Sequence, residues 1–141
     1  MTENNEEMMA YSLQIKNHLV VNEMVSAING STMMCHGLSN ESGWWEGLSA
    51  SDPRDFMVKL CLIHSEVSEA MEGCRKDLMD DHLPHRKMAE VELADAVIRI
   101  MDLAGAAGYD LGSAMVEKLQ YNQNRADHKV ENRASKGGKK F

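Results

Sequence analysis

The feature that most constrains the fold is the segment VELADAVIRIMDLA at residues 91–104. In a helix built from this segment, apolar side chains lie nearly all the way round, which predicts a buried helix without a broad face toward solvent. The charged residues fall within an arc of about 80° on a helical wheel; they are Glu92, Asp95, Arg99 and Asp102. Charged groups are costly to bury unless they are paired or bind a metal. The segment therefore needs other helices around it, and its charged stripe needs a partner.

Three further helices follow from the spacing of apolar residues, so the predicted fold is an all-α, four-helix bundle-like domain. Only 5% of the residues are aromatic and 12 are Met, which favours helices over β-strands. The pair Asn29-Gly30 is a common helix end, whereas Asp52-Pro53 and Asp110 are typical helix starts. The helices expected from these signals cover residues 3–28, 54–78, 84 to about 105–108, and 110–127.

The length and the distribution of turn-forming residues predict one domain with a long internal loop. The chain has 141 residues, which is enough for one core and too few for two. We assign residues 1–128 to this domain and residues 129–141 to a flexible basic tail. Residues 30–52 are rich in Gly, Ser and Asn. They are expected to form a long loop, which in a small domain is often functional.

Charge, cysteine count and hydropathy limit the partners and the compartment. The net charge is −7, and residues 128–141 hold five Lys or Arg against one Glu, which leaves −11 on the rest. Such an acidic body argues against a nucleic-acid partner. No apolar run reaches the roughly 18 residues that indicate a membrane span, and the acidic amino terminus does not resemble a signal peptide. Three cysteines without a close pair indicate reduced thiols, so we expect a cytoplasmic protein.

Two pairs of acidic residues with the same spacing indicate a metal site. Glu66 and Glu69 lie one turn apart on the second expected helix, and Glu92 and Asp95 repeat the spacing on the third. Two antiparallel helices joined by a short turn bring these pairs face to face, where four carboxylates repel one another unless a cation lies between them. No His follows a Glu at the spacing of di-iron sites. An all-oxygen ligand set favours Mg²⁺ or Mn²⁺.

The fourth expected helix carries a polar row that complements this acidic centre. Lys118, Asn122 and Arg125 lie at i, i+4 and i+7, so they share one helix face. An ammonium, an amide and a guanidinium in a row suit the oxygens of phosphate groups. We therefore expect a phosphorylated small molecule, with divalent cations between it and the acidic body.

The acidic pairs and this polar row together resemble the all-α nucleoside triphosphate pyrophosphohydrolases, and their MazG-like branch in particular. Glu66-x-x-Glu69, a 22-residue gap and Glu92-x-x-Asp95 are similar to the metal signature of that superfamily, and the resemblance covers residues 55–128. It implies an all-α homodimer or homotetramer that uses Mg²⁺ to cleave a nucleoside triphosphate to the monophosphate and pyrophosphate. It also implies that the four carboxylates hold the metals and that the polar row contacts the phosphates.

The motif GWWEG, within the expected long loop, departs from the compact members of that family. Trp44 or Trp45 can stack on a nucleobase, or either can bury against another subunit. On the second expected helix, Lys59 is predicted to lie at the surface and His64 to have a structural role.

Other interpretations of the charged residues stay open at the level of sequence. A buried ion pair with Arg99 is the alternative to metal binding for Glu92 and Asp95, and Asp102 is the expected partner of Arg99. The alternative functions are a dUTPase-like relative, or a non-catalytic helical module whose acidic residues bind a structural cation or a partner protein.

Overall fold

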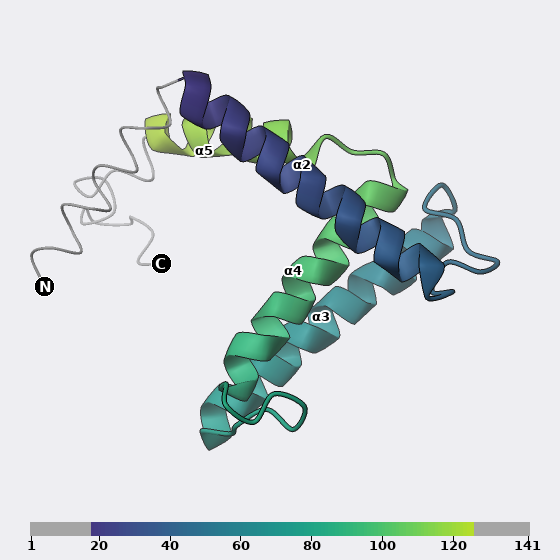
Figure 1. The fold of residues 1–141 in the computed structure, drawn as a ribbon, viewed down its shortest axis with the longest axis vertical. Coiled ribbons are helices and arrows are strands. Elements are labelled where there is room, and N and C mark those ends of the chain that lie inside the picture. The colour runs from purple at the N-terminus through teal and green to yellow at the C-terminus, as the bar shows by residue number, and fades with distance from the viewer. Residues whose placement is uncertain (1–17, 126–141) are drawn as a thin grey trace, which may run out of the picture. The chain divides into compact units, whose positions relative to one another are not determined.

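The computed structural model describes residues 18–125, and its regular secondary structure there is helical (Figure 1). In chain order the helices are α2 (His18–Glu41), α3 (Pro53–Lys76), α4 (Met88–Ala106) and α5 (Leu111–Asn124). The predicted all-α class is confirmed for this part of the chain, in which one isolated β-bridge joins Met79 and Lys87. Among these helices, none has the length and hydropathy needed to span a membrane.

The described residues divide into two compact units. One unit comprises residues 29–109, which contain the second half of α2, all of α3 and α4, and the connections between them. The other contains residues 18–28 of α2 and residues 110–125, including α5. The start of the first predicted helix and the predicted basic tail, residues 129–141, lie outside the described residues.

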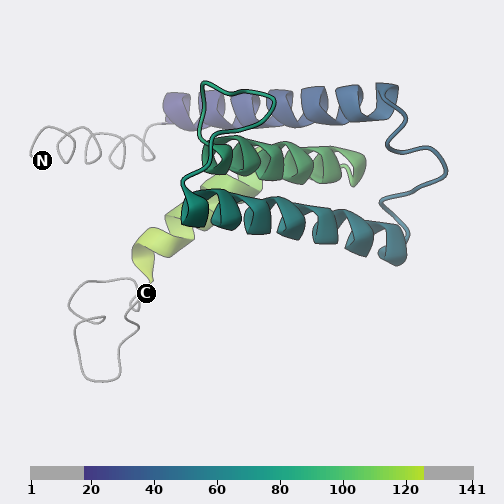
Figure 2. The same cartoon turned by 90° about the horizontal axis from the view of Figure 1, so that it is seen from below.

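α3 and α4 form an antiparallel hairpin, and Figures 1 and 2 show the two helices side by side. Their backbones approach closely near the connection, since a Cβ atom at Gly73 would lie 2.9 Å from the Cβ atom of Met88. Ala70 on α3 and Ala96 on α4 are also buried. Small residues allow this close approach, which brings together the longer side chains that flank the contact.

The connection between α3 and α4 is longer than the sequence predicts. Asp77 adopts a left-handed conformation, with φ of 52°, and ends α3. The chain then folds back on itself, and the Asp80 N–H group donates to the carbonyl oxygen of Arg86 at 3.0 Å. The Met88 N–H group donates to the carbonyl oxygen of Leu78 at 3.0 Å in the same connection. α4 therefore begins at Met88 and not earlier in the chain. The prediction that Pro84 opens this helix is therefore wrong.

α2 ends later in the chain than predicted, and the loop that follows it is shorter. The pair Asn29-Gly30 lies inside the helix and does not end it. The expected loop over residues 30–52 is reduced to residues 42–52. Its first turn is set by Gly43, whose φ of 81° belongs to the left-handed region that glycine adopts without strain.

Contact with α4 explains why α2 continues through a glycine. A Cβ atom at Gly105 would lie 2.6 Å from the Cβ atom of His36 and 3.1 Å from the carbonyl oxygen of Thr32. Thr32 itself is buried. A glycine in a helix interior costs only about 1 kcal/mol, so packing of the following turns outweighs the local signal to stop.

Two helix starts occur at the predicted residues. The Asp52 side chain accepts a hydrogen bond from the Arg54 N–H group at 2.7 Å, directly before Pro53 opens α3. The Asp110 side chain accepts from the Ser113 N–H group at 3.0 Å and caps α5. Both bonds satisfy backbone donors that have no partner within the helix.

Candidate metal centre and adjoining cavity

An acidic cluster lies where α3 and α4 face each other in the hairpin. Carboxylate oxygens of Glu66, Glu69 and Glu92 all lie within 4.8 Å of one another. Glu66 and Glu69 are one turn apart on α3, and Glu92 comes from the first turns of α4. Glu66 and Glu92 are buried, whereas Glu69 is exposed. The hairpin thus brings together three of the four residues predicted to bind metal.

Burial and mutual repulsion change the titration of these carboxyl groups. Desolvation, a hydrogen bond to Glu66 and the charge of Glu69 raise the pKa of Glu92 to about 7. Desolvation also raises the pKa of Asp95, helped by the charge of Glu66 and opposed by that of Arg99. The raised pKa values reflect burial first and neighbouring negative charge second, and a cation at the cluster would neutralise that charge.

Asp95, the fourth predicted ligand, lies beside the cluster of three. The negative charges of Glu66 and Asp80 are close enough to raise its pKa. Asp80 is buried in the α3–α4 connection, where its Oδ1 atom accepts hydrogen bonds from the N–H groups of His82 and Leu83. Nothing in the sequence singles out Asp80, because only the folding back of the connection brings it near α4.

Arg99 forms an ion pair with the cluster. Its Nε atom donates to Oε1 of Glu66 at 2.6 Å, and the arginine side chain is 40% exposed while the glutamate is buried. The expectation that Arg99 pairs with Asp102 is therefore wrong. Arg99 reaches across to α3, whereas Asp102, one turn further along α4, contacts α2 and the following loop.

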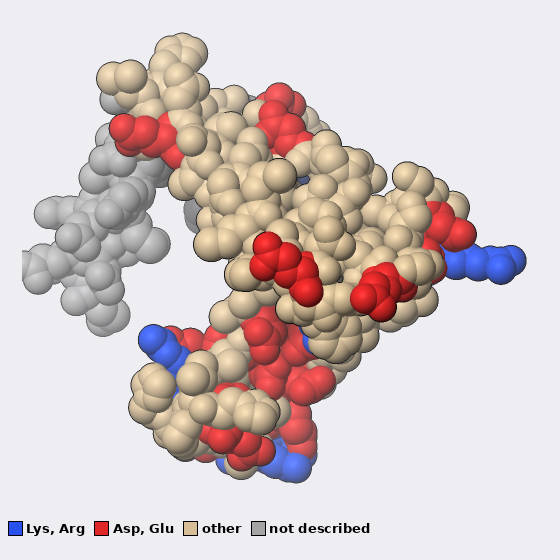
Figure 3. All heavy atoms as spheres, turned by 45° about the vertical axis from the view of Figure 1, so that its right-hand side comes forward, with Lys and Arg blue, Asp and Glu red and all other residues tan. Residues whose placement is uncertain are grey.

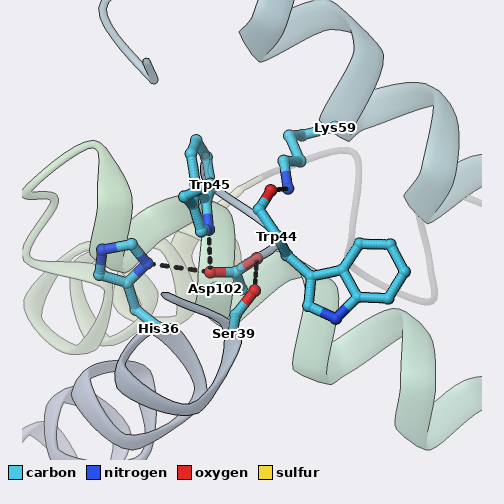
Figure 4. A network of polar contacts seen from close by, with 6 residues as sticks. All are labelled: His36, Ser39, Trp44, Trp45, Lys59 and Asp102. Carbon is cyan, nitrogen blue, oxygen red and sulfur yellow. Dashed lines mark hydrogen bonds and ion pairs between the residues drawn. The ribbon is translucent and has the colours of Figure 1, made fainter. Parts of the chain in front are cut away.

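Asp102 is the centre of a second polar network, shown in Figure 4. Its Oδ1 atom accepts from the indole N–H of Trp45 at 2.8 Å and contacts Nδ1 of His36 at 2.9 Å. Its Oδ2 atom accepts from the Ser39 hydroxyl at 2.9 Å. Asp102 and Trp45 are both buried, and the bonds offset the desolvation of the carboxylate. The network fastens the end of α2 and its loop to α4.

Lys59 holds the same loop from α3. Its ammonium group donates to the Trp44 carbonyl oxygen at 2.9 Å and lies 4.1 Å from the centroid of the Trp45 ring, a cation–π contact. Lys59 is buried, so its predicted surface position is wrong; the loop covers it. The two indoles point in different directions, with Trp45 directed toward Asp102 and Trp44 away from it (Figure 4).

A cavity of about 520 Å³ adjoins the acidic cluster within the unit that contains α3 and α4. Its wall includes Ser39 from α2, the neighbouring Trp44, and Lys59 from α3. α4 contributes Asp95 and Arg99, the two residues that also border the cluster. The cavity and the cluster therefore adjoin through Asp95 and Arg99. The volume of the cavity is in the range of small-molecule sites, about 300–1,000 Å³.

Some members of this site are missed at the sequence level for an identifiable reason. His36 and Ser39 are three residues apart, so on a continuous helix they share one face. The predicted helix end at Asn29-Gly30 conceals this spacing, because it places both residues in a loop.

The predicted phosphate-binding row lies on α5 and at its end, in the other compact unit. The Lys118 ammonium lies 4.7 Å from the centroid of the Tyr121 ring, and the Arg125 guanidinium carbon lies 5.8 Å from it. The side-chain oxygen of Asn122 is buried without a hydrogen-bond partner among the described residues. Phosphate binding by the row stays a prediction.

The chemistry of the cluster fits a hard divalent cation. Figure 3 shows carboxylates gathered over the half of the α3–α4 hairpin nearer its connection, with few basic side chains, most of them at the edges. The three clustered side chains are all carboxylates, and among the described residues no His or Cys belongs to the group. Oxygen ligands of this kind suit Mg²⁺ or Mn²⁺ better than zinc or iron.

Comparison of the chain with protein-family models, with curated proteins and with solved structures finds no match. The resemblance to the MazG-like enzymes thus stays a prediction from the spacing of the acidic pairs and the polar row.

Proposed function

We propose that the protein is a Mg²⁺-dependent nucleotide pyrophosphohydrolase of MazG-like type. It would cleave a nucleoside triphosphate between the α and β phosphates, giving the monophosphate and pyrophosphate. The observation that carries the proposal is the convergence of three carboxylates, two of them buried, beside a cavity of suitable size for a nucleotide. Burying like charges is unfavourable for folding, so their convergence supports a role in binding a cation.

The residues of the cluster would hold the metal through Glu66, Glu69 and Glu92, with Asp95 at its border. When bound, Mg²⁺ or Mn²⁺ would supply positive charge to phosphate oxygens and make a coordinated water more acidic. Because its pKa is about 7, Glu92 can release its proton near neutral pH and become a ligand.

The phosphates would be held by basic side chains. Arg99 borders both the cluster and the cavity and is partly exposed, so its guanidinium can turn from Glu66 to a phosphate oxygen. Lys118, Asn122 and Arg125 would also neutralise charge on the phosphates, as the resemblance implies. The active form would be a cytoplasmic homodimer or homotetramer.

A panel of nucleotides tests the reaction. Pyrophosphate release is measured from canonical and modified dNTPs and NTPs with Mg²⁺, Mn²⁺ or EDTA, and the other product is identified. We expect metal-dependent release with the monophosphate as co-product. Glu69→Gln, at an exposed ligand, should lower turnover by about 100-fold or more. The matched control is Glu72→Gln, whose partly exposed carboxylate pairs with Arg75 and lies outside the cluster.

A non-catalytic module is the second candidate, and the ion pair between Arg99 and Glu66 favours it, because that pair balances part of the charge without a cation. If a cation only stabilises the fold, a chelator or Glu69→Ala should lower the melting temperature markedly. The enzyme instead predicts unchanged or higher melting with lost turnover. Unchanged melting with unchanged turnover in Glu69→Ala would contradict the metal site. Release from dUTP alone would favour the dUTPase-like relative.

A further inference from the structure

We propose that the cavity beside the acidic cluster binds the nucleobase, that Trp44 forms its stacking wall, and that Asp102 positions Trp44 by holding Trp45. The proposal rests on the proposed function and adds the residues that recognise the base. It makes Trp44 a binding residue and Asp102 a positioning residue.

Trp44 combines a hydrogen-bonded backbone with an exposed indole. Its backbone N–H donates to the Ser39 carbonyl oxygen at 3.1 Å, and its own carbonyl oxygen accepts from Lys59 at 2.9 Å. The backbone is thus held on both sides, whereas the side chain is 65% exposed and lines the cavity. An indole with a fixed backbone and an open face can stack on a planar ring without further ordering of the backbone.

The neighbouring indole supplies the anchor. Trp45 is buried, donates to Asp102, and contacts His36 edge to face at a centroid distance of 5.5 Å. Gly43, at φ of 81°, reverses the chain immediately before the two tryptophans. The loop therefore cannot move Trp44 without breaking the bonds of Trp45 to Asp102 and of Lys59 to the loop.

The cavity extends along α4 from the border of the acidic cluster to Asp102. Glu92, Asp95, Arg99 and Asp102 follow one side of the helix, and the last three line the cavity. At 1.5 Å per residue, Glu92 and Asp102 are about 15 Å apart along the axis. This separation suits an extended nucleotide with its base near Asp102 and its phosphates near the cluster.

The polar groups of the wall suit a nitrogen heterocycle. The Ser39 hydroxyl donates its hydrogen to Asp102. Its oxygen can therefore only accept a hydrogen bond from a ligand. Lys59 has N–H groups beyond the one that binds the loop. Burial and the charge of Asp102 raise the pKa of Cys35, another wall residue, so its thiol stays neutral. A ring with N–H and carbonyl groups matches these partners.

Calorimetric titration with two probes tests the stacking wall. The probes are the α,β-imido analogues of the four dNTPs and inorganic tripolyphosphate, which has no base, each with Mg²⁺. Trp44→Ala should weaken binding of the dNTP analogues by about 5–150-fold and leave tripolyphosphate binding unchanged. Trp44→Phe should restore most of the loss. The matched control is Leu48→Ala, which removes an exposed apolar side chain of the same loop that does not line the cavity.

A double-mutant cycle tests the positioning role. Asp102 accepts from three donors, on His36, Ser39 and Trp45. In Asp102→Asn one of these donors faces an amide NH₂ group, which loosens the hold on the loop. The variant should therefore bind the dNTP analogues more weakly but bind tripolyphosphate as before. In the Trp44→Ala background the same change should have little further effect, because the stacking wall is already gone. Full additivity, or equal loss for both probes, would overturn the positioning role.

The outcomes separate this inference from the proposed function. If the wild-type protein binds both probes and Trp44→Ala changes neither affinity, the base subsite is refuted while the pyrophosphohydrolase proposal stands. If neither probe binds with Mg²⁺, the proposed function fails, and titration with deoxynucleosides in EDTA decides the subsite. Deoxynucleoside binding by the wild-type protein that is lost in Trp44→Ala would support the subsite. Absence of deoxynucleoside binding by the wild-type protein would overturn it. A change in sedimentation of Trp44→Ala, without a change in analogue affinity, would instead assign the indole to a subunit contact.

Discussion

At the scale of the residue, Glu92 links the acidic cluster to the stability of the fold. Its raised pKa, about 7, means that the folded protein keeps a proton which the unfolded chain loses near pH 4.5. Between these two pH values the folded state binds more protons, so the free energy of unfolding falls as pH rises. The carboxyl group contributes most to stability when protonated, and least above neutrality without a cation.

This linkage predicts the pH dependence of stability without metal. In EDTA, raising the pH from 5 to 7.5 should lower the free energy of unfolding of the wild-type protein relative to Glu92→Gln by about 1–3 kcal/mol. The amide of the variant stays neutral, so its stability lacks this component. Urea unfolding of both proteins at the two pH values measures the difference. An equal dependence on pH in both proteins would show that Glu92 is ionised at pH 5 in the folded state.

At the scale of the element, α2 tests how tertiary packing acts on a local signal. Gly30 lies in the helix interior, and a Cβ atom there would meet nothing within 4 Å. Gly30→Ala should therefore raise the free energy of unfolding by about 0.5–1 kcal/mol. The matched substitution, Gly43→Ala, places a side chain at φ of 81° and should cost about 1–2 kcal/mol.

Urea unfolding of the two alanine variants measures these opposite changes. A loss of stability in Gly30→Ala would mean that the residue ends the helix in a left-handed conformation, as the pair Asn29-Gly30 suggests on its own. The sign of the change in the free energy of unfolding in Gly30→Ala thus distinguishes a continuous α2 from a helix followed by a long loop.

At the scale of the whole molecule, the described residues bury few large apolar side chains. The buried apolar residues are Trp45, Ala70, Ala96, Leu103, Ala104 and Val116, and half of them are alanines. The hairpin instead leaves apolar side chains exposed on both helices, including Val67 and Met71 on α3 and Leu93 and Val97 on α4. An exposed apolar surface of this kind is typical of a face that contacts another protein. A second copy of the chain that packs against this face would give the expected oligomer.

The exposed face of the hairpin predicts an oligomer that a single charge disrupts. Val97→Glu should shift the protein to monomer in sedimentation velocity, because association would bury an unpaired carboxylate. Leu83→Glu, at an exposed position of the α3–α4 connection, is the control and should leave the oligomer intact. A monomeric wild-type protein at working concentration would contradict the expectation.

Sequence alone determined those features that depend on neighbours along the chain. Asp52 and Asp110 cap helices as predicted, since a cap involves only the adjacent turn. The spacing of Glu66 and Glu69 placed them on one helix face, and the pattern of the third predicted helix required partners for its charges. These signals are local and periodic, so they are readable without the fold.

Tertiary structure decided which partners those charges have. Arg99 pairs with Glu66 across the hairpin, and Asp102 binds Trp45 and His36, although the sequence pairs Arg99 with Asp102 by their spacing. Residues far apart in the chain meet only after α2 continues past Gly30 and crosses α4. That continuation depends on packing worth more than the local cost of a glycine, and no property of the segment by itself reveals it.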